Sequence, residues 1–449
     1  MTTARPIFVT AFILLAAAAL PGSAWAEDIS ANEEAIIRNV DETTEAQSAF
    51  IERVVNINSG TMNLAGVRAV GDAFAAGFRA LGMTTEWLDM PQEMNRAGHL
   101  VARTRGTRGE EGGQGGGSGK RLLLLGHLDT VFPKDSPFQK FERAAGGDGN
   151  TATGPGVEDM KAGNATILYA LRALHAVGAL ESSRITVMLT GDEELAGAPL
   201  SLSRQAMIAL GKEADAALSF ESGTIDTAVV ARRGSSNWQL YVKGKRAHSS
   251  GIFNEDNGAG AVFEAARILN AFYEELRGEE YLTFNPGVIA GGTEVTLDIE
   301  ASSGTAFGKT NVIAQDVMIS GGLRFLTQEQ LERARGKMRE IVARSLPHTS
   351  ARIDFQDRYP GMAPTAGNLA LFEVLKGVNA DLDMPVPTAW DPGKRGAGDI
   401  SFVAPFVASI DGLGPTGEGG HTPGESLDLT SVAPMTKRAA LLIYRLTRE

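Results

Sequence analysis

Seven acidic and histidine side chains stand at points of the chain where they could share metal ions. The chain contains no cysteine, so any metal must be held by carboxylates and imidazoles. Two metal ions that share one bridging carboxylate would need most of these side chains as ligands. One glutamate would remain free to act as a general base. The pattern predicts a dinuclear metallohydrolase built on the following side chains: His127, Asp129, Asp159, Glu193, Glu194, Glu221 and His421.

Several of these residues directly follow segments with the composition of buried strands. Residues 122–126, 185–190 and 214–220 are mainly apolar, and segments with helical periodicity alternate with them. This alternation predicts an α/β fold with a mostly parallel sheet and helices on both of its faces. Because α/β enzymes place their sites at the carboxyl ends of parallel strands, we expect the side chains after these segments to meet.

His127 and Asp129 lie two residues apart on an extended segment, so both side chains point the same way. Such a pair allows the imidazole to bind metal while the carboxylate behind it sets the tautomer. A His-x-Asp triplet is common, and taken alone it usually has no functional meaning.

Adjacent glutamates at the end of a buried strand are unfavourable unless a positive charge meets them, which suits Glu193 and Glu194 to a metal site. One of them could bind metal while its neighbour accepts a proton from water. A solvated acidic turn is the alternative for this pair. Asp159 follows a glycine-rich turn near a helix start, where a carboxylate could bridge two cations or simply cap the helix.

The hydrophobic pattern changes after about residue 233. Alternating apolar and polar residues predict strands exposed on one face, and helical segments at 257–276 and 328–346 give the order β-α-β-β-α-β. This order is typical of a small ferredoxin-like domain inserted into a larger one. The predicted division is a signal peptide at 1–26, a first part of the catalytic domain at 27–233, the inserted domain at 234–357 and a second part of the catalytic domain at 358–449.

Length, charge and the N-terminal segment narrow the class of protein. A chain of 449 residues predicts two or three domains, and a net charge of -12 argues against nucleic acid as a partner. Residues 1–26 have the features of a secretory signal: Arg5, an apolar run from Ile7 to Leu20 and an Ala-x-Ala site ending at Ala26. We therefore expect a periplasmic or secreted protein without stable membrane insertion after signal removal; an uncleaved anchor is the alternative.

Five motifs resemble those of the M20 metallopeptidases and, within that family, its glutamate carboxypeptidase-like branch. As a set they are highly specific, and the resemblance covers nearly all of the chain after residue 26. The motifs are Gly126-His127-Leu128-Asp129-Thr130, Gly154–Gly163, Gly191-Asp192-Glu193-Glu194, Ser219-Phe220-Glu221 and Gly420-His421-Thr422-Pro423.

The resemblance implies two Zn²⁺ ions per subunit, with Co²⁺ or Mn²⁺ as possible replacements, and a role for each candidate side chain. The implied roles are His127 and Glu221 on one ion, Glu194 and His421 on the other, Asp159 as the bridge, Glu193 as the general base and Asp129 as the orienter of His127.

The inserted domain resembles the lid and dimerisation domain of the same family, which implies a homodimer. Arg246-Ala247-His248-Ser249-Ser250-Gly251 resembles a motif whose imidazole reaches the active site of the neighbouring subunit and stabilises the oxyanion. Asn311 and Arg324 resemble lid positions that contact substrate. Gly398 lies in a glycine-rich segment similar to one near the family's substrate, although a simple turn fits that segment equally well.

Arg324 and two long segments of the chain carry further expectations. Arg324 suits a substrate carboxylate because a guanidinium binds both oxygens at once, and a solvated strand residue is the alternative. Segments 103–120 and 290–309 are predicted to be loops longer than the family pattern, with a strand-like stretch at about 293–299 inside the second.

The predicted reaction is zinc-dependent hydrolysis that releases a C-terminal amino acid, glutamate-type favoured, from a peptide or an N-acyl amino acid. Deacylation of an N-acyl amino acid or cleavage of a dipeptide on the same scaffold is the nearest alternative, because specificity resides in pocket shape. A metal-dependent binding protein without catalysis is the alternative from another class.

Overall fold

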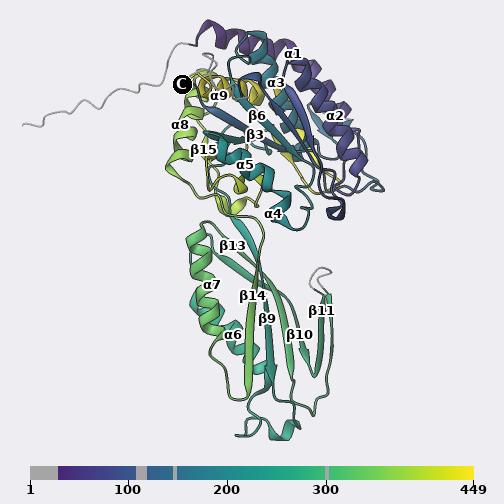
Figure 1. Cartoon of the computed structure of the whole chain (residues 1–449), viewed down its shortest axis with the longest axis vertical. Helices are drawn as coiled ribbons and strands as arrows, with labels where there is room; N and C mark the ends of the chain where they lie inside the picture. The colour runs from purple at the N-terminus through teal and green to yellow at the C-terminus, as the bar shows by residue number, and fades with distance from the viewer. Residues whose placement is uncertain (1–28, 108–118, 145–148, 299–302, 449) are drawn as a thin grey trace, which may run out of the picture.

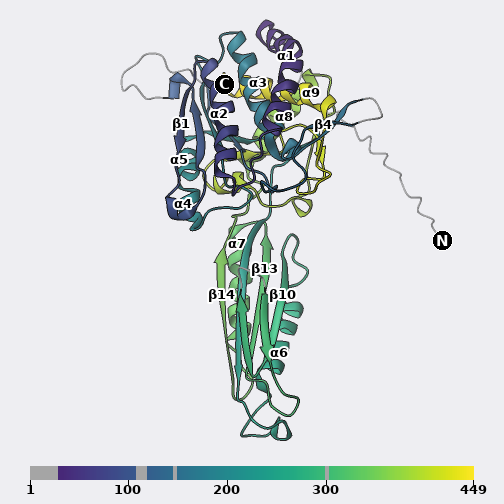
Figure 2. The same ribbon diagram turned by 90° about the vertical axis from the view of Figure 1, so that its right-hand side faces the viewer.

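The computed structural model describes residues 29–107, 119–144, 149–298 and 303–448, so the predicted signal peptide lies outside the described residues. A rounded α/β body holds the first and last parts of the chain, and an elongated second domain projects from it (Figures 1 and 2). Within the described ranges, no helix combines the length and the apolar character needed to cross a membrane.

A six-stranded sheet forms the centre of the body. Strands β6, β3, β7 and β16 run parallel to one another, whereas β1 and β2 pair antiparallel at one edge. The predicted α/β fold with a mostly parallel sheet is confirmed. In sheet order the strands are β1 (Thr84–Leu88), β2 (His99–Arg103), β6 (Arg184–Thr190), β3 (Arg121–His127), β7 (Ala216–Ser219) and β16 (Ala408–Ile410).

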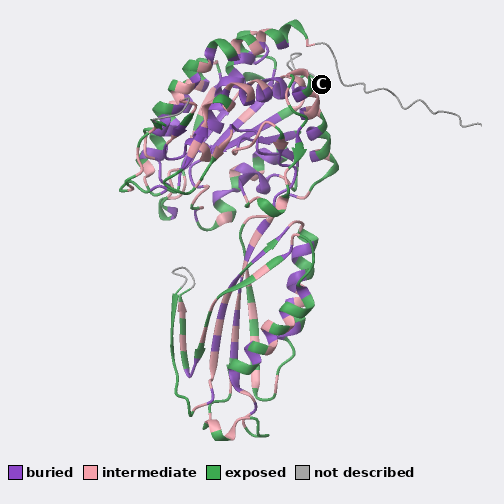
Figure 3. Ribbon diagram, turned by 180° about the vertical axis from the view of Figure 1, so that it is seen from behind, coloured by how far each residue is buried: buried purple, intermediate pink, exposed green. Residues whose placement is uncertain are grey.

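Alternate residues of β3 face two separate cores, because successive side chains of a strand point to opposite faces. Leu122 and Leu124 join the core beneath α1, α2, α3, α8 and α9, whereas Leu123 and Leu125 join the core beneath α5. The buried strands are visible at the centre of the body in Figure 3. The helices of the body are α1 (Ala31–Val55), α2 (Leu64–Ala80), α3 (Ala162–Ala176), α4 (Leu200–Ser203), α5 (Gln205–Glu213), α8 (Ala366–Asp381) and α9 (Val432–Leu446).

Local sequence signals set where the longer helices begin. Ser30 and Glu33 form a capping box at the start of α1, since each side chain accepts a hydrogen bond from the backbone N–H of the other. The hydroxyl of Thr365 caps α8 in the same way by accepting from Asn368 N–H. These caps satisfy backbone donors that have no partner within the helix.

The second domain is an antiparallel sheet with two helices on one face. Trp238 and Leu240 on one strand pack with Phe272 and Met338 on the helices, which buries that face of the sheet. Both connections to the body lie at one end of this sheet. The elements follow the predicted β-α-β-β-α-β order as β9 (Gly234–Gly244), α6 (Gly260–Leu276), β10 (Thr283–Gly292), β13 (Asp316–Phe325), α7 (Gln328–Val342) and β14 (Thr349–Asp357), with sheet order β10, β13, β9, β14.

The prediction of a long loop at 290–309 was wrong, whereas the strand predicted at about 293–299 inside it is confirmed as β11 (Glu294–Asp298). Strand β10 continues to Gly292, and β11 then pairs antiparallel with β12 (Ser303–Phe307) as a separate hairpin. Alternating Val295 and Leu297 supply the strand pattern of β11, whereas β12 is exposed throughout and offers no such pattern. The predicted loop at 103–120 contains a short turn at Arg105–Thr107, and residues 108–118 lie outside the described ranges.

Short strands of the body bring two distant loops together. β5 (Thr151–Thr153) pairs with β18 (Ser426–Asp428), so the turn after β5 lies beside the loop before β18. These two segments carry Asp159 and His421. The remaining short strands are β4 (Glu142–Arg143), β8 (Thr227–Ala228), β15 (Thr388–Ala389) and β17 (Gly417–Glu418).

Candidate metal centre

Three neighbouring parallel strands of the body end side by side and place their following residues together. In the strand register His127 lies opposite Thr190, the last residue of β6, and Leu125 lies opposite Ser219, the last residue of β7. Glu193, Glu194 and Glu221 therefore follow strand ends that adjoin His127. The sheet geometry explains why side chains almost a hundred residues apart in the sequence converge.

Two groups of potential metal ligands form around Asp159. In the first, His127 Nε2 lies 2.9 Å from Asp159 Oδ1 and 3.8 Å from Glu221 Oε1. In the second, His421 Nε2 lies 3.1 Å from both Asp159 Oδ2 and Glu194 Oε2. Each group places its ligand atoms within 4.8 Å of one another, and Asp159 belongs to both. The five side chains that the sequence singled out as ligands thus lie together, with one carboxylate positioned between two sites.

Glu425 fixes the turn that carries Asp159. Its carboxylate accepts hydrogen bonds from the backbone N–H groups of Gly156, Glu158 and Asp159 at 3.1, 2.8 and 3.0 Å. Glu425 is buried, and this burial raises its pKa to about 7 against the opposing effect of the three N–H donors. Sequence reasoning did not select this residue; its only signal was a place in the same polar loop as His421.

Asp129 connects His127 to the glutamate pair. Its carboxylate accepts from the backbone N–H of Glu193 at 3.0 Å and of Glu194 at 3.1 Å, and from the Thr61 hydroxyl at 2.6 Å. The His127 Nδ1 lies 3.0 Å from the Asp129 carbonyl oxygen and 3.5 Å from its carboxylate. The shorter contact indicates that the backbone carbonyl accepts the Nδ1 proton, which leaves Nε2 free to act as a ligand.

The electrostatics of the cluster favour the binding of cations. Burial raises the pKa of Glu193 well above its usual range and that of Glu221 to about 8, and neighbouring carboxylates add to both shifts. Hydrogen bonds to Asp159 and Glu194 raise the pKa of His421 to about 11. Burial opposes ionisation of Asp159, but hydrogen bonds from the two imidazoles hold its pKa low. Added positive charge would relieve the carboxylate repulsion.

Two buried arginines hold the glycine-rich segment that contains Gly398. Arg232 donates to the carbonyl oxygens of Gly396 and Ala397 at 2.8 and 2.9 Å, and Arg204 donates to the Asp399 carboxylate at 2.8 Å. A Cβ atom at Gly398 would lie 2.3 Å from the Arg232 Nη1. A side chain at 398 would therefore displace the guanidinium from these hydrogen bonds, a packing reason for glycine that is independent of any substrate contact.

Arg324 lies at the end of the second domain that adjoins the body. In the sheet register it is opposite Ser235 on β9 and Thr283 on β10, so these three side chains share one face. Arg233 reaches the same place, since it donates to the Thr283 hydroxyl at 3.3 Å and to the Gly393 carbonyl at 3.1 Å. Burial and the nearby Arg233 lower the pKa of Arg324.

This arginine pair has no acidic partner among the described residues, and the Nε of Arg233 is buried without a hydrogen-bond partner. Two guanidinium groups so placed favour an anionic ligand. Sequence reasoning selected Arg324 but missed Arg233, for which the Arg232-Arg233 doublet before the second domain was the available signal.

His248 and Asn311 lie together at the opposite end of the second domain. The Ser249 N–H donates to the Asn311 carbonyl at 2.9 Å, and both His248 and Asn311 are exposed. They flank the far end of β9, whose 11 residues span roughly 35 Å from the junction with the body. Figure 1 shows this end pointing away from the body. The structure separates these two residues from Arg324 and from the ligand groups of their own chain.

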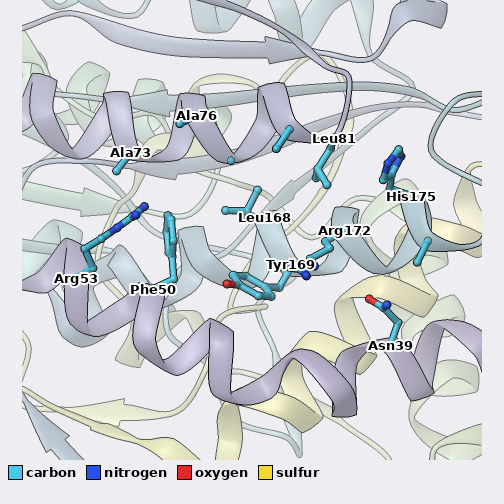
Figure 4. A pocket seen from close by; sticks show the side chains of 13 residues that line it. Asn39, Phe50, Arg53, Ala73, Ala76, Leu81, Leu168, Tyr169, Arg172 and His175 are labelled. Atoms are coloured by element: carbon cyan, nitrogen blue, oxygen red, sulfur yellow. The ribbon is translucent and has the colours of Figure 1, made fainter.

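A large hollow on the body lies away from these residues, between α1, α2 and α3. Its volume is about 650 Å³, and Phe50, Leu168, Tyr169 and Arg172 are among the side chains that line it (Figure 4). None of the sequence-selected candidates borders it. Convergence of ligating side chains, rather than the volume of a cavity, locates the candidate site.

The sequence profile of peptidase family M20/M25/M40 matches residues 123–445. The chain belongs to this family. It is therefore a hydrolase of the M20 type, a group of metallopeptidases and amidohydrolases. The match includes all seven acidic and histidine residues of the candidate site, so the family assignment and the geometry concern the same part of the molecule.

Relatives of known name extend over most of the chain. Carboxypeptidase G2 of Pseudomonas sp. (strain RS-16) is 26% identical over 415 residues, which cover 90% of each chain. A succinyl-diaminopimelate desuccinylase of Bradyrhizobium sp. (strain ORS 278) is 25% identical over 345 residues, covering 73% of this chain and 82% of the relative.

Solved structures share the fold. The aminopeptidase PepT of Bacillus cereus ATCC 10987 aligns with a TM-score of 0.66 at 18% identity, covering 90% of this chain and 98% of that one. A dinuclear metal-binding M20 peptidase of Bacillus subtilis aligns with a TM-score of 0.58 at 14% identity, covering 91% and 99% of the two chains.

Proposed function

We propose that this protein hydrolyses the amide bond of a peptide or an N-acyl amino acid and releases the C-terminal amino acid, with glutamate-type residues favoured. The observation that carries the proposal is the pair of ligand groups about Asp159, whose members His127, Glu221 and Glu194 act electrostatically on the carboxyl of Glu193. The name of carboxypeptidase G2 supports release from the carboxyl end.

The residues fit two divalent cations, for which zinc is the first choice and Co²⁺ or Mn²⁺ are alternatives. Each group offers one imidazole and two carboxylates, a donor set that suits zinc, and Asp159 is common to both. When bound, such ions supply Lewis acidity, which polarises a carbonyl oxygen and lowers the pKa of water. The excess of buried carboxylates over cationic groups supports this assignment.

Glu193 is the general base of the proposed reaction. Its backbone is held from two sides, because its N–H donates to Asp129 at 3.0 Å and its carbonyl accepts from the Tyr359 hydroxyl at 3.0 Å. Burial raises the pKa of its carboxyl, which favours uptake of a proton from the attacking water. The hydroxyl of that water bonds to the amide carbon, and Glu193 passes the proton to the amine nitrogen as the C–N bond breaks.

Arg324 and Arg233 are the proposed site for the carboxylates of the released residue. A guanidinium binds both oxygens of a carboxylate, and two neighbouring guanidiniums suit a residue that has a carboxylate on its side chain as well as at its C-terminus. The missing partner of the Arg233 Nε supports an anion at this position. This is the structural reason to favour a glutamate-type residue.

His248 and Asn311 are proposed to act on the neighbouring subunit of a homodimer. Their place at the far end of the second domain puts them out of reach of the ligand groups in their own chain. An imidazole brought to the carbonyl oxygen by a partner would stabilise the charge that develops there. The second domain would then serve both as dimer contact and as lid.

Deacylation is the second candidate reaction. A relative named succinyl-diaminopimelate desuccinylase, 25% identical over 73% of this chain, favours an N-acyl amino acid as substrate. The ligand groups and Glu193 would act in the same way on either amide. The two reactions differ in the part of the substrate that the protein selects. In the first it is the released amino acid, and in the second it is the acyl group.

Export through a signal peptide that ends at Ala26 remains a proposal from the sequence, and it places the protein in the periplasm or outside the cell. N-terminal sequencing of the protein recovered from the producing cells tests it. A chain that still begins at Met1 would contradict it.

A release assay tests the proposed function. Zinc-loaded protein would be incubated with dipeptides and N-acyl amino acids that differ in the C-terminal residue, with Glu193→Ala as the control. We expect free amino acid from substrates with an acidic C-terminal residue and none from the control. Substrates recovered unchanged from protein that holds two metal ions would contradict hydrolysis and support a binding protein.

A further inference from the structure

Tyr359 joins the connection between the two domains to the backbone of the proposed general base. It lies two residues after β14, where the chain returns from the second domain to the body. Its hydroxyl donates to the Glu193 carbonyl oxygen at 3.0 Å. Burial and the carboxylates of Asp399 and Glu193 raise the pKa of this hydroxyl, so it keeps its proton and can donate.

The two connections between the domains pair side by side and hold the backbone of Tyr359. Ser235 N–H donates to the Tyr359 carbonyl at 2.8 Å, and Tyr359 N–H donates to the Ser235 hydroxyl at 3.3 Å. Three residues further into the body, Arg232 and Met362 exchange two backbone hydrogen bonds of 2.9 Å each. Tyr359 therefore has a fixed place between the second domain and the body.

Arg204 holds the Tyr359 hydroxyl from the other side. Its Nη2 donates to that hydroxyl at 3.4 Å and to the Asp192 carbonyl oxygen at 3.1 Å. The guanidinium is fully buried and forms ion pairs with Asp192 at 2.6 Å and with Asp399 at 2.8 Å. The Tyr359 ring packs on Phe402, with the ring centroids 5.0 Å apart. Because the hydroxyl accepts one hydrogen bond while it donates another, its direction is fixed.

The same buried carboxylates hold the segment that leads from β6 past Glu193. Asp399 accepts from the hydroxyl of Thr190, the last residue of β6, at 2.7 Å. Asp192 accepts from the backbone N–H of Gly197 at 2.8 Å, beyond the glutamate pair. The segment is thus held before and after Glu193, while the bond from the tyrosine hydroxyl holds Glu193 itself.

The peptide group between Glu193 and Glu194 is held at both of its polar atoms. Its oxygen accepts from Tyr359, and its N–H donates to the Asp129 carboxylate at 3.1 Å. This peptide joins the proposed base to a potential metal ligand, so its orientation sets where the Glu193 side chain points. A general base acts only within hydrogen-bond reach of the proton that it accepts. A displacement of about 1 Å can lower a rate by about 100-fold.

We propose that Tyr359 is a positioning residue for the general base: its hydroxyl orients the peptide between Glu193 and Glu194 and so places the Glu193 carboxyl. Arg204 acts one step further away, by holding that hydroxyl. This inference rests on the proposed function, because it takes Glu193 as the base. Loss of the hydroxyl should lower turnover but not metal content, since Glu194 keeps its own bond to Asp129.

Tyr359→Phe in the zinc-loaded protein tests the proposal, because it removes the hydroxyl alone. With a substrate that has an acidic C-terminal residue, we expect kcat to fall by about 10-fold or more while KM stays unchanged. Tyr241→Phe is the matched control and should keep the wild-type kcat, since the Tyr241 hydroxyl bonds to Gln239 within β9 at 2.7 Å. Added to Glu193→Ala, Tyr359→Phe should not lower the residual rate further, because it acts only through Glu193.

A wild-type kcat in Tyr359→Phe, or a further loss of rate when it is added to Glu193→Ala, would overturn the positioning role while leaving the proposed function intact. Hydrolysis of no substrate by the wild-type protein would instead count against the proposed function. Amide hydrogen exchange then decides whether the hydroxyl orients this peptide. Residues 191–197 should exchange about 2- to 10-fold faster in Tyr359→Phe than in Tyr241→Phe, the effect of one hydrogen bond. Equal exchange in the two variants would overturn the proposal.

Discussion

The body and the far end of the second domain hold their functional side chains in different ways. In the body, buried carboxylates of Asp129 and Glu425 fix the backbone of Glu194 and Asp159 through hydrogen bonds. At the far end, His248 is exposed, and its ring contacts Ser250, only two residues away. The ligand groups are therefore preorganised within one chain. His248 and Asn311 can contribute to catalysis only if a neighbouring subunit brings its active site to them.

The largest expected effect comes from removing the base in the preorganised region. Glu193→Ala should lower kcat by about 100- to 10,000-fold, the usual contribution of a general base. Metal content should not change, because Glu193 belongs to neither ligand group. Steady-state kinetics together with elemental analysis checks both parts. A folded variant with two metal ions and wild-type turnover would remove Glu193 from the mechanism.

The far end is tested by His248→Ala, which should lower kcat by about 100- to 1,000-fold if its imidazole stabilises the oxyanion. Its exposure predicts unchanged folding. Subunit exchange between His248→Ala and Glu193→Ala proteins should restore activity, because one site of the mixed dimer then has both groups intact. No recovery after exchange, or a monomer in light scattering, would argue against action on a partner.

The link between Glu425 and the Asp159 turn should control metal affinity. Glu425→Gln replaces one of two accepting oxygens by an NH₂ group that faces backbone N–H donors, and we expect metal binding to weaken by about 10- to 100-fold. Competition with a chromogenic chelator measures this. Glu418→Gln, an exposed glutamate of the neighbouring strand β17, is the control. Equal affinities of the two variants would show that the turn holds its shape without Glu425.

Substitutions at the end of the second domain that adjoins the body should affect substrate binding more than turnover. Arg324→Ala and Arg233→Ala should each lower kcat/KM for a substrate with an acidic C-terminal residue by about 10- to 100-fold, the contribution of one charged hydrogen bond. Arg352→Ala, an exposed arginine elsewhere on the same sheet, provides the comparison. If Arg233→Ala behaves like this control, the second carboxylate is bound elsewhere.

The smallest expected effect is on stability and concerns Gly398. Because a Cβ there would meet the Arg232 guanidinium, Gly398→Ala should lower the free energy of unfolding by about 1–3 kcal/mol. Gly396→Ala adds a Cβ that meets no atom within 4 Å and is the matched control. Thermal unfolding of the metal-loaded proteins compares them. Equal transition temperatures would show that Arg232 moves aside freely.

The ligand groups could be anticipated because strand periodicity is a local property. Apolar segments such as 122–126 identify buried strands, and their ends identify one edge of a sheet. The same reasoning placed the helices and most strands of the second domain, β11 included, but it missed the pairing partner β12. It could not find Glu425, Arg233 or Arg204, because each acts through contacts with residues distant in sequence and none belongs to a periodic pattern.

The sequence by itself determined the α/β fold, the family and the set of side chains that converge, since these follow from hydrophobic periodicity and from residue types at strand ends. Only the tertiary structure decided which side chains share a site. It placed Arg233 beside Arg324, set His248 and Asn311 apart from both, and brought the Tyr359 hydroxyl to the backbone of Glu193. These contacts depend on which strands pair and on which loops lie side by side. A local pattern of residues cannot predict either, because the partners are distant in the sequence.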